Sequence, residues 1–346
     1  MSVLYSLARP LLFALDPERA HSITLTGLDV ANRLGILPCL AGPVVETPQT
    51  VMGLRFPNPV GLAAGLDKNA EHVDALSKLG FGFIEVGTVT PRAQPGNAPQ
   101  RLFRLPRAQA LVNRMGFNND GVERFVANVR ASPYDGILGI NIGKNFDTPI
   151  ERALEDYRYC LRAVYPHASY VTINISSPNT QNLRNLQEGA ALQELLMGLA
   201  LERRILSEEY GRRVPIAVKI SPDLDKSDVQ YVAQTVCSHE MDAIIATNTT
   251  TSRAGVEDLR DAGQAGGLSG APLRERATQV VGWLHEALAG QLPVIAVGGI
   301  MKAGDAIEKL SAGASLIQLY TGLIYRGPQL VADCARAVHE FIEQAH

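Results

Sequence analysis

The stretch GFIEVGTVT (residues 82–90) is apolar along most of its length and ends in small polar residues. Nearly continuous apolar strands are typical of parallel sheets that helices cover on both faces. Seven further runs have the same character: NPVGLAAG (58–65), ILGINIG (137–143), YVTINISSP (170–178), PIAVKISP (215–222), AIIATNT (243–249), PVIAVGG (293–299) and LIQLYT (316–321). Amphipathic segments such as 191–211 and 277–290 separate most of them, and this alternation predicts parallel strands with right-handed crossovers. Eight such runs favour an α/β fold of the closed (β/α)8 TIM-barrel type over an open doubly wound sheet.

Residues 1–45 do not follow this alternation, so we expect an N-terminal two-helix extension before a barrel domain that spans 46–346. Apolar residues at helical spacing predict the first helix, and Pro10 is expected to break it or to start a turn. Asp16-Pro17 is a good start for the second helix, which Gly35 is expected to end. The apolar positions of both helices are Val3, Leu4, Leu7, Leu11, Leu15, Ala20, Ile23, Leu28, Ala31 and Leu34. The residues alone favour packing of these faces on the barrel, and they leave contact with a membrane surface open.

The composition argues against several classes of function. The 346 residues carry a net charge of −3, and no dense basic cluster indicates nucleic-acid binding. The four cysteines (Cys39, Cys160, Cys237 and Cys334) are far apart and form no CxxC motif, so neither a zinc site nor an iron–sulfur cluster is expected. Isolated thiols in a large chain are typical of a reduced, cytosolic protein. No run of about 18 apolar residues is present, so no membrane-spanning segment is expected.

Polar residues gather at the carboxyl ends of the predicted strands. They are Lys68, Thr88, Asn141, Asn174, Ser177, Lys219, Thr247, Asn248 and Thr249. A barrel places the ends of all its strands on one rim, where the active sites of this fold form. A single buried polar residue is usually structural, but convergence from six strands predicts a functional site. The two long connections, 91–136 and 250–276, follow strands and are expected on the same face.

Three glycine-rich segments, GGLSG (266–270), VGGI (297–300) and YTGLIYRGP (320–328), follow the last three predicted strands. Glycines let backbone N–H groups approach an anion closely, and the loops after the seventh and eighth strands are the usual phosphate site of a TIM barrel. Their order and position predict a ligand that carries a phosphate. No G-x-G-x-x-G motif follows a strand, so a dinucleotide-binding fold is not indicated.

Lys219 lies inside an apolar strand, where a lysine without a partner is rarely buried. Burial would lower its pKa toward Schiff-base chemistry; alternatively, the lysine stays cationic beside a cofactor ring. The same two interpretations apply to Lys68. In the stretch TINISSPNT (172–180), no neighbouring histidine is present to activate Ser176 or Ser177 as a nucleophile.

Six motifs occur together and in a fixed order: GLAAGLDK (61–68), EVGTVTPRAQPGN (85–97), NRMGFNN (113–119), NISSPNT (174–180), ATNTT (246–250) and GGLSG (266–270). They closely resemble the motifs of dihydroorotate dehydrogenases of the quinone-dependent, membrane-associated class. The resemblance runs from about residue 40 to the C-terminus, and the two-helix extension matches as well. It implies an FMN enzyme that oxidises (S)-dihydroorotate to orotate in pyrimidine synthesis and passes the electrons to a membrane quinone.

The resemblance also implies roles for individual residues. FMN contacts are implied for Ala64, Gly65, Leu66, Asp67, Lys68, Thr88, Asn141, Asn174, Lys219, Thr247, Gly270, Gly299, Tyr320 and Thr321. Dihydroorotate contacts are implied for Lys68, Asn113, Arg114, Met115, Gly116, Phe117, Asn174, Asn179, Asn248 and Thr249. Ser177 is the implied base for the C5 proton, with Thr180 as a candidate relay, while the C6 hydride goes to FMN. Lys219 would stabilise the negative charge of the reduced flavin, and Lys68 would neutralise the orotate carboxylate.

With the resemblance, a membrane contact of residues 1–45 becomes the favoured interpretation. We expect a monomer attached peripherally to the cytoplasmic face of a bacterial inner membrane. Three alternatives remain open at this point. They are a Schiff-base aldolase with Lys219 as nucleophile, a soluble dihydroorotate dehydrogenase that uses fumarate or NAD, and a non-catalytic flavin- or phosphate-binding barrel. The soluble class has a cysteine base at the position of Ser177.

Overall fold

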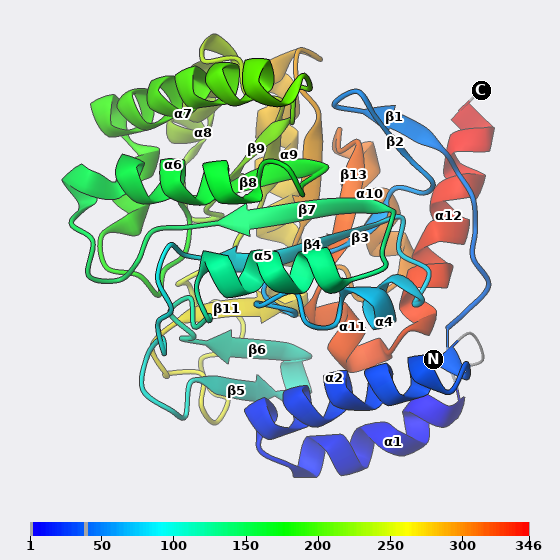
Figure 1. Cartoon of the computed structure of the whole chain (residues 1–346). Helices are drawn as coiled ribbons and strands as arrows, with labels where there is room; N and C mark the ends of the chain where they lie inside the picture. The colour runs from blue at the N-terminus through cyan, green and yellow to red at the C-terminus, as the bar shows by residue number, and fades with distance from the viewer. Residues whose placement is uncertain (1–2, 38–40, 346) are drawn as a thin grey trace.

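The eight predicted runs form one closed parallel barrel in the computed structural model, which describes residues 3–37 and 41–345 (Figure 1). The strands are β3 (Val60–Leu62), β4 (Phe83–Val89), β7 (Ile137–Ile142), β8 (Tyr170–Asn174), β9 (Ile216–Ile220), β10 (Ala243–Ala246), β12 (Val294–Val297) and β13 (Leu316–Leu319). They are neighbours in this order, and β13 pairs with β3 to close the barrel. The predicted TIM barrel is therefore confirmed. Cys39 and the side chains of Val3 and Leu4 lie outside the described part.

Helices surround the barrel (Figure 1). They are α4 (Val73–Ser77), α5 (Val122–Ala131), α6 (Ala153–Val164), α7 (Gly189–Tyr210), α8 (Lys226–Ser238), α9 (Arg274–Leu288), α10 (Ala303–Ser311), α11 (Thr321–Arg326) and α12 (Gln329–Ala345). The predicted helical segments 191–211 and 277–290 correspond to α7 and α9. Local signals set their ends: Asp225 caps α8 by accepting a bond from the Asp228 N–H, and α7 ends at Gly211 with a positive φ of 63°.

The amino-terminal end of the barrel is filled by apolar side chains. A hairpin of β1 (Gln49–Val51) and β2 (Leu54–Phe56) precedes the first barrel strand and brings Phe56 into this layer. Phe56 is fully buried and meets the Phe83 ring edge-on, with centroids 5.1 Å apart. A Cβ at Gly61 would lie 2.2 Å from the Phe83 ring, so this strand needs glycine to admit the ring. The packed floor leaves the opposite, carboxyl end of the barrel for a ligand.

The two long connections form a second sheet that the sequence did not predict. It contains β5 (Leu102–Leu105), β6 (Ala110–Asn113) and β11 (Gly267–Gly270), and all its pairings are antiparallel. β5 and β6 come from the 91–136 connection, whereas β11 comes from 250–276. In Figure 1 this sheet lies below the barrel, and its strand β5 is next to the N-terminal helices. Both connections thus lie on the face at the carboxyl ends of the barrel strands, as expected.

The N-terminal extension consists of α1 (Val3–Ala14) and α2 (Pro17–Arg33). The expected break at Pro10 is wrong, because α1 continues through this residue. A proline inside a helix removes one backbone hydrogen bond, but contacts of α1 with α11 offset the loss. The Arg9 guanidinium donates to the Tyr325 carbonyl at 3.1 Å, and Phe13 packs edge-on against the Tyr325 ring at 5.2 Å. The start of α2 is as predicted, since the Asp16 carboxylate accepts bonds from two backbone N–H groups.

Several apolar side chains of the extension face solvent. Leu7, Leu11 and Leu34 are 68%, 74% and 67% exposed, whereas Ala20 and Ala31 are buried. The predicted apolar stripe of α2 is therefore divided between the barrel and the outer surface. Within the described ranges, no helix is both long enough and apolar enough to cross a membrane.

Candidate active site

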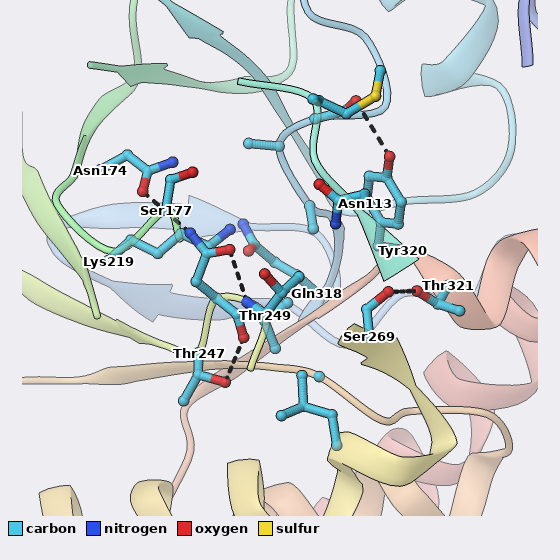
Figure 2. A pocket seen from close by; sticks show the side chains of 18 of the residues that line it. Asn113, Asn174, Ser177, Lys219, Thr247, Thr249, Ser269, Gln318, Tyr320 and Thr321 are labelled. Atoms are coloured by element: carbon cyan, nitrogen blue, oxygen red, sulfur yellow. Dashed lines mark hydrogen bonds between the residues drawn. The ribbon is translucent and has the colours of Figure 1, made fainter. Parts of the chain in front are cut away.

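A pocket opens at the carboxyl ends of the barrel strands and encloses about 1030 Å³, part of it open to solvent. Residues on or just after β3, β4, β8, β9, β10, β12 and β13 line it, and β6 and β11 form another wall. Figure 2 shows Asn174, Ser177 and Lys219 on one side of this space, with Ser269 and Thr321 on the opposite side. The convergence of strand ends predicted from the sequence is thus present in the structure.

Two groups of asparagines present amides to the pocket. In one group, the Asn179 amide donates to Asn113 Oδ1 at 3.1 Å. In the other, the Asn248 amide donates to Asn174 Oδ1 at 3.3 Å and to Ser176 Oγ at 3.0 Å. Ser176 is fully buried, and its hydroxyl also donates to Asn174 Oδ1 at 3.2 Å. Ser176 therefore holds two site asparagines together, a role that the sequence left unassigned.

Ser177 lies at the point where β8 ends and the chain turns at Pro178. Its side chain lines the pocket and is only 5% exposed. The backbone N–H of Asn179 donates to Ser177 Oγ at 3.2 Å, so the turn holds the hydroxyl oxygen in place. Thr180 is buried as well, and its hydroxyl has no hydrogen-bond partner among the described residues.

Two lysines supply positive charge. Burial, reinforced by the nearby Arg101, lowers the pKa of Lys68 to about 8, although Glu18 and Asp67 oppose the shift. Burial also lowers the pKa of Lys219, and the charge of Glu85 acts in the opposite direction. Within the part of the chain that the structure describes, the Lys219 ammonium has no hydrogen-bond partner. A buried cation that no described residue accepts a hydrogen bond from is costly, which points to a ligand with an acceptor at this place.

The far end of the pocket is formed by glycines of the late loops. Gly270, Gly298, Gly299 and Gly322 line it, and the Thr321 and Ser269 hydroxyls are 2.9 Å apart. A Cβ at Gly299 would lie 2.2 Å from the Arg274 backbone, and one at Gly322 would lie 2.1 Å from the Ile300 carbonyl. Only glycine permits these loops to pack so closely, and the result is a pocket end bounded by backbone.

Most of the predicted site residues come together in this pocket. Its walls contain Ala64, Gly65, Lys68, Thr88, Asn113, Met115, Gly116, Phe117, Asn174, Ser177, Asn179, Lys219, Thr247, Asn248, Thr249, Gly270, Gly299, Tyr320 and Thr321. Four predicted residues lie outside the walls. Leu66 lines a neighbouring cavity, and the Asp67 carboxylate accepts bonds from the Glu71 and His72 N–H groups. Asn141 is fully buried beneath the pocket, and Arg114 turns toward Gln264, to which it donates at 2.8 Å.

Sequence reasoning missed other wall residues, namely Ala63, Ser269, Leu273, Val297, Gly298, Ile300, Gln318, Leu319 and Gly322. Ser269, Val297, Gly298, Ile300 and Gly322 belong to the glycine-rich segments that predicted a phosphate site. Gln318 carried a signal of its own, because it is a polar residue inside an apolar strand run. Its Oε1 atom is buried without a hydrogen-bond partner among the described residues.

A second, mainly apolar cavity of about 1590 Å³, also partly open, lies between the N-terminal helices and the barrel. Leu12, Phe13, Ala20, Leu25, Leu28, Leu76, Leu79, Leu102, Leu111 and Leu323 are among its lining residues. Tyr320 lines both this cavity and the pocket, so the two spaces are neighbours. His21 also lines the apolar cavity, and burial lowers its pKa to about 3.

Comparisons with known proteins agree with this geometry. Residues 47–342 match the family model of dihydroorotate dehydrogenase. The chain is 59% identical over 336 residues to the dihydroorotate dehydrogenase (quinone) of Nitrosospira multiformis, which covers 97% of this chain and 96% of that protein. It is 59% identical over 333 residues to the protein of the same name from Methylococcus capsulatus, with coverages of 96% and 98%.

A solved structure is similar as well. The crystal structure of dihydroorotate dehydrogenase from Eimeria tenella in complex with ferulenol matches with a TM-score of 0.86 and 35% identity. The match covers 95% of this chain and 92% of that chain. The similarity therefore extends over nearly the whole chain, and the chain belongs to the dihydroorotate dehydrogenase family, in its quinone-dependent class.

Proposed function

We propose that this chain oxidises (S)-dihydroorotate to orotate for pyrimidine synthesis, with FMN as electron acceptor and a membrane quinone as final oxidant. The observation that carries the proposal is the pocket in which Ser177 lies among amides and beside two lysines. The quinone-dependent relatives support this chemistry over a Schiff-base aldolase, a soluble fumarate- or NAD-dependent enzyme and a non-catalytic barrel.

The donor set of the pocket fits a flavin mononucleotide. The Lys219 ammonium, which has no hydrogen-bond acceptor among the described residues, suits the electron-rich edge of the flavin ring, where a cation stabilises charge on reduction. Gln318 Oε1 and Thr249 Oγ1 are buried acceptors without partners among the described residues, and a ring N–H or a ribityl hydroxyl would satisfy them. The backbone-lined end at Gly270 and Gly299 suits the phosphate. FMN would supply the two-electron acceptor.

Dihydroorotate fits the amide-rich half of the pocket. Its ring alternates carbonyl and N–H groups, and each asparagine side chain offers a donor and an acceptor to such a ring. Asn113 with Asn179, and Asn174 with Asn248, present these groups from two walls. Lys68 lines the same pocket and would neutralise the carboxylate of the substrate.

The oxidation removes a proton from C5 and a hydride from C6. Ser177 takes the C5 proton, whose acidity the adjacent ring carbonyl raises. The Asn179 N–H that donates to Ser177 Oγ favours the negative charge that develops on this oxygen. Thr180, whose hydroxyl has no hydrogen-bond partner in the described part of the chain, is the group proposed to pass the proton onward. The hydride leaves toward the cofactor, so both electrons leave the substrate together.

The apolar cavity under α1 and α2 is the proposed quinone site. Its lining suits a prenylated ring, and Tyr320 separates it from the pocket. Exposed leucines on the outer face of the extension support a peripheral attachment to the membrane, from which the quinone would enter. We propose a monomer at the cytoplasmic face of a bacterial inner membrane.

The test uses the purified protein with dihydroorotate and a short-chain quinone analogue. A yellow protein that forms orotate and quinol in equal amounts is the expected result, with little turnover when fumarate or NAD replaces the quinone. A colourless protein, or a substrate adduct trapped on Lys219 by borohydride, would refute the proposal.

A further inference from the structure

A carboxylate lies at the centre of the barrel, directly beneath the pocket. Glu85 is fully buried on β4, and its oxygens accept three hydrogen bonds from uncharged donors. The donors are Asn141 Nδ2 at 2.9 Å, the Tyr170 hydroxyl at 2.9 Å and Gln318 Nε2 at 2.7 Å. Burial and the neighbouring carboxylate raise the pKa of Tyr170, which keeps this residue a neutral donor. A buried carboxylate is costly, and stability alone gives no reason to place it here.

In these three contacts Glu85 accepts and does not donate, so it fixes the direction of every amide that it touches. Asn141 must turn its NH₂ group toward Glu85, so its Oδ1 atom faces the pocket side of the barrel. There it accepts from the Thr88 hydroxyl at 2.6 Å and from Asn174 Nδ2 at 3.2 Å. Asn174 consequently turns its own Oδ1 toward Asn248, whose amide donates to it at 3.3 Å. One charge thus sets the orientation of three asparagines in series.

Gln318 is oriented in the same way. Because its NH₂ group donates to Glu85, its Oε1 atom is left without a partner among the described residues, at a pocket wall. Glu85 also acts on Lys219, a residue of β9. Burial lowers the pKa of Lys219, and the charge of Glu85 raises it. The two residues lie on different strands, and within the described part of the chain they form no direct ion pair. Lys219 lies in register with Asn174 on the neighbouring strand β8, and Asn174 is linked to Glu85 through the hydrogen bonds of Asn141, so the two charges share the interior of the barrel.

We propose that Glu85 is a positioning residue of the active site, with two effects on the groups above it. It fixes the direction of Asn141 and, through it, the donor and acceptor directions that Asn174 and Asn248 present to the substrate ring, and it provides the counter-charge of Lys219, the lysine proposed to meet the flavin. This inference rests on the proposed function, since it concerns how the site presents itself to orotate and FMN.

The experiment compares the FMN-loaded wild type with Glu85→Gln. The substitution keeps the shape of the side chain, removes the charge and adds an NH₂ group that lets Asn141 reverse its amide. Orotate should bind at least about tenfold more weakly in calorimetric titration, as expected for a lost or reversed hydrogen bond. The midpoint potential of bound FMN should move to a more positive value, because a negative charge near the flavin is gone.

Asn141→Leu separates the two effects. It interrupts the chain between Glu85 and Asn174 but leaves the carboxylate, so orotate should bind more weakly while the potential stays near that of the wild type. This variant also tests the amide orientation if Glu85→Gln does not fold. Glu202→Gln is the matched control, because Glu202 is equally buried but pairs with Arg158 and Arg162 outside the barrel. It should change neither quantity.

Wild-type orotate affinity and potential in Glu85→Gln, with FMN still bound, would overturn this inference and leave the proposed function intact. Unchanged orotate affinity in Asn141→Leu would overturn the amide-orientation effect. A wild-type protein that bound neither FMN nor orotate would overturn the proposed function and this inference with it.

Discussion

Replacing Ser177 by alanine tests the central step of the proposed chemistry. The side chain is 5% exposed and accepts one hydrogen bond, from the Asn179 N–H at 3.2 Å. Loss of that bond should lower the free energy of unfolding by about 1 kcal/mol, which the protein tolerates. Loss of a general base, in contrast, slows proton transfer by about 10²–10⁴, or about 2.7–5.5 kcal/mol of activation free energy. The fold and the FMN content should therefore persist while flavin reduction nearly stops.

The assay mixes the enzyme anaerobically with dihydroorotate and follows the loss of flavin absorbance. Deuterium at C5 should slow Ser177→Ala more than the wild type, because removal of this proton becomes rate-limiting. Ser177→Cys retains a proton acceptor at the same place and should reduce the flavin faster than the alanine variant. Flavin reduction in Ser177→Ala within about fivefold of the wild type would exclude Ser177 as the base, since this lies well below the loss expected for a general base.

Three further outcomes are expected. Gly27→Leu places a side chain in the apolar cavity, where a Cβ has no described neighbour within 4 Å. It should raise the KM for a quinone analogue several-fold without slowing flavin reduction. Gly282→Leu on α9 has equal space and should leave this KM unchanged. In calorimetric titrations, orotate should bind with constant affinity below about pH 8 and more weakly above it, by at most about tenfold per pH unit. The reason is that Lys68 is charged only below its pKa of about 8. Lys68→Met should bind orotate weakly at every pH and lose this pH dependence. Phe56→Ala should lower the free energy of unfolding by about 3–5 kcal/mol in urea titrations, since this fully buried ring fills the barrel floor, and a cost below about 1 kcal/mol would contradict that role.

The barrel could be predicted from the sequence because its strands are buried on both faces. A run such as residues 82–90 has no solvent-facing positions, and its apolar character therefore shows without any knowledge of its partners. The sheet of β5, β6 and β11 gave no comparable signal. Its strands are four residues long, and β6 pairs with a segment about 150 positions further along, as the bond from Asn113 to the Gly267 carbonyl illustrates. Such pairing is decided by tertiary contacts.

The site divides in a similar way. Motif positions indicated which residues belong to it, but not which side chains enter the pocket. Asn141 and Asp67 are held by hydrogen bonds to other protein groups, and Arg114 points away toward Gln264. Glu85 was missed although it carried the same signal as Lys219, a charge inside an apolar strand. Recognising it required the three donors that surround it, and these come from three other strands.

The docking of α1 on α11 has a consequence for biosynthesis. The Tyr5 hydroxyl donates to the Ile324 carbonyl, a contact between residues 319 positions apart. At about 5–20 residues per second, a ribosome needs about 15–60 s to make the chain between them. During that time the first helices made have no barrel to pack on, because β13 and α11 are among the last elements synthesised. The apolar faces of α1 and α2 are therefore exposed to membranes, chaperones and proteases during translation for longer than the faces of elements made later.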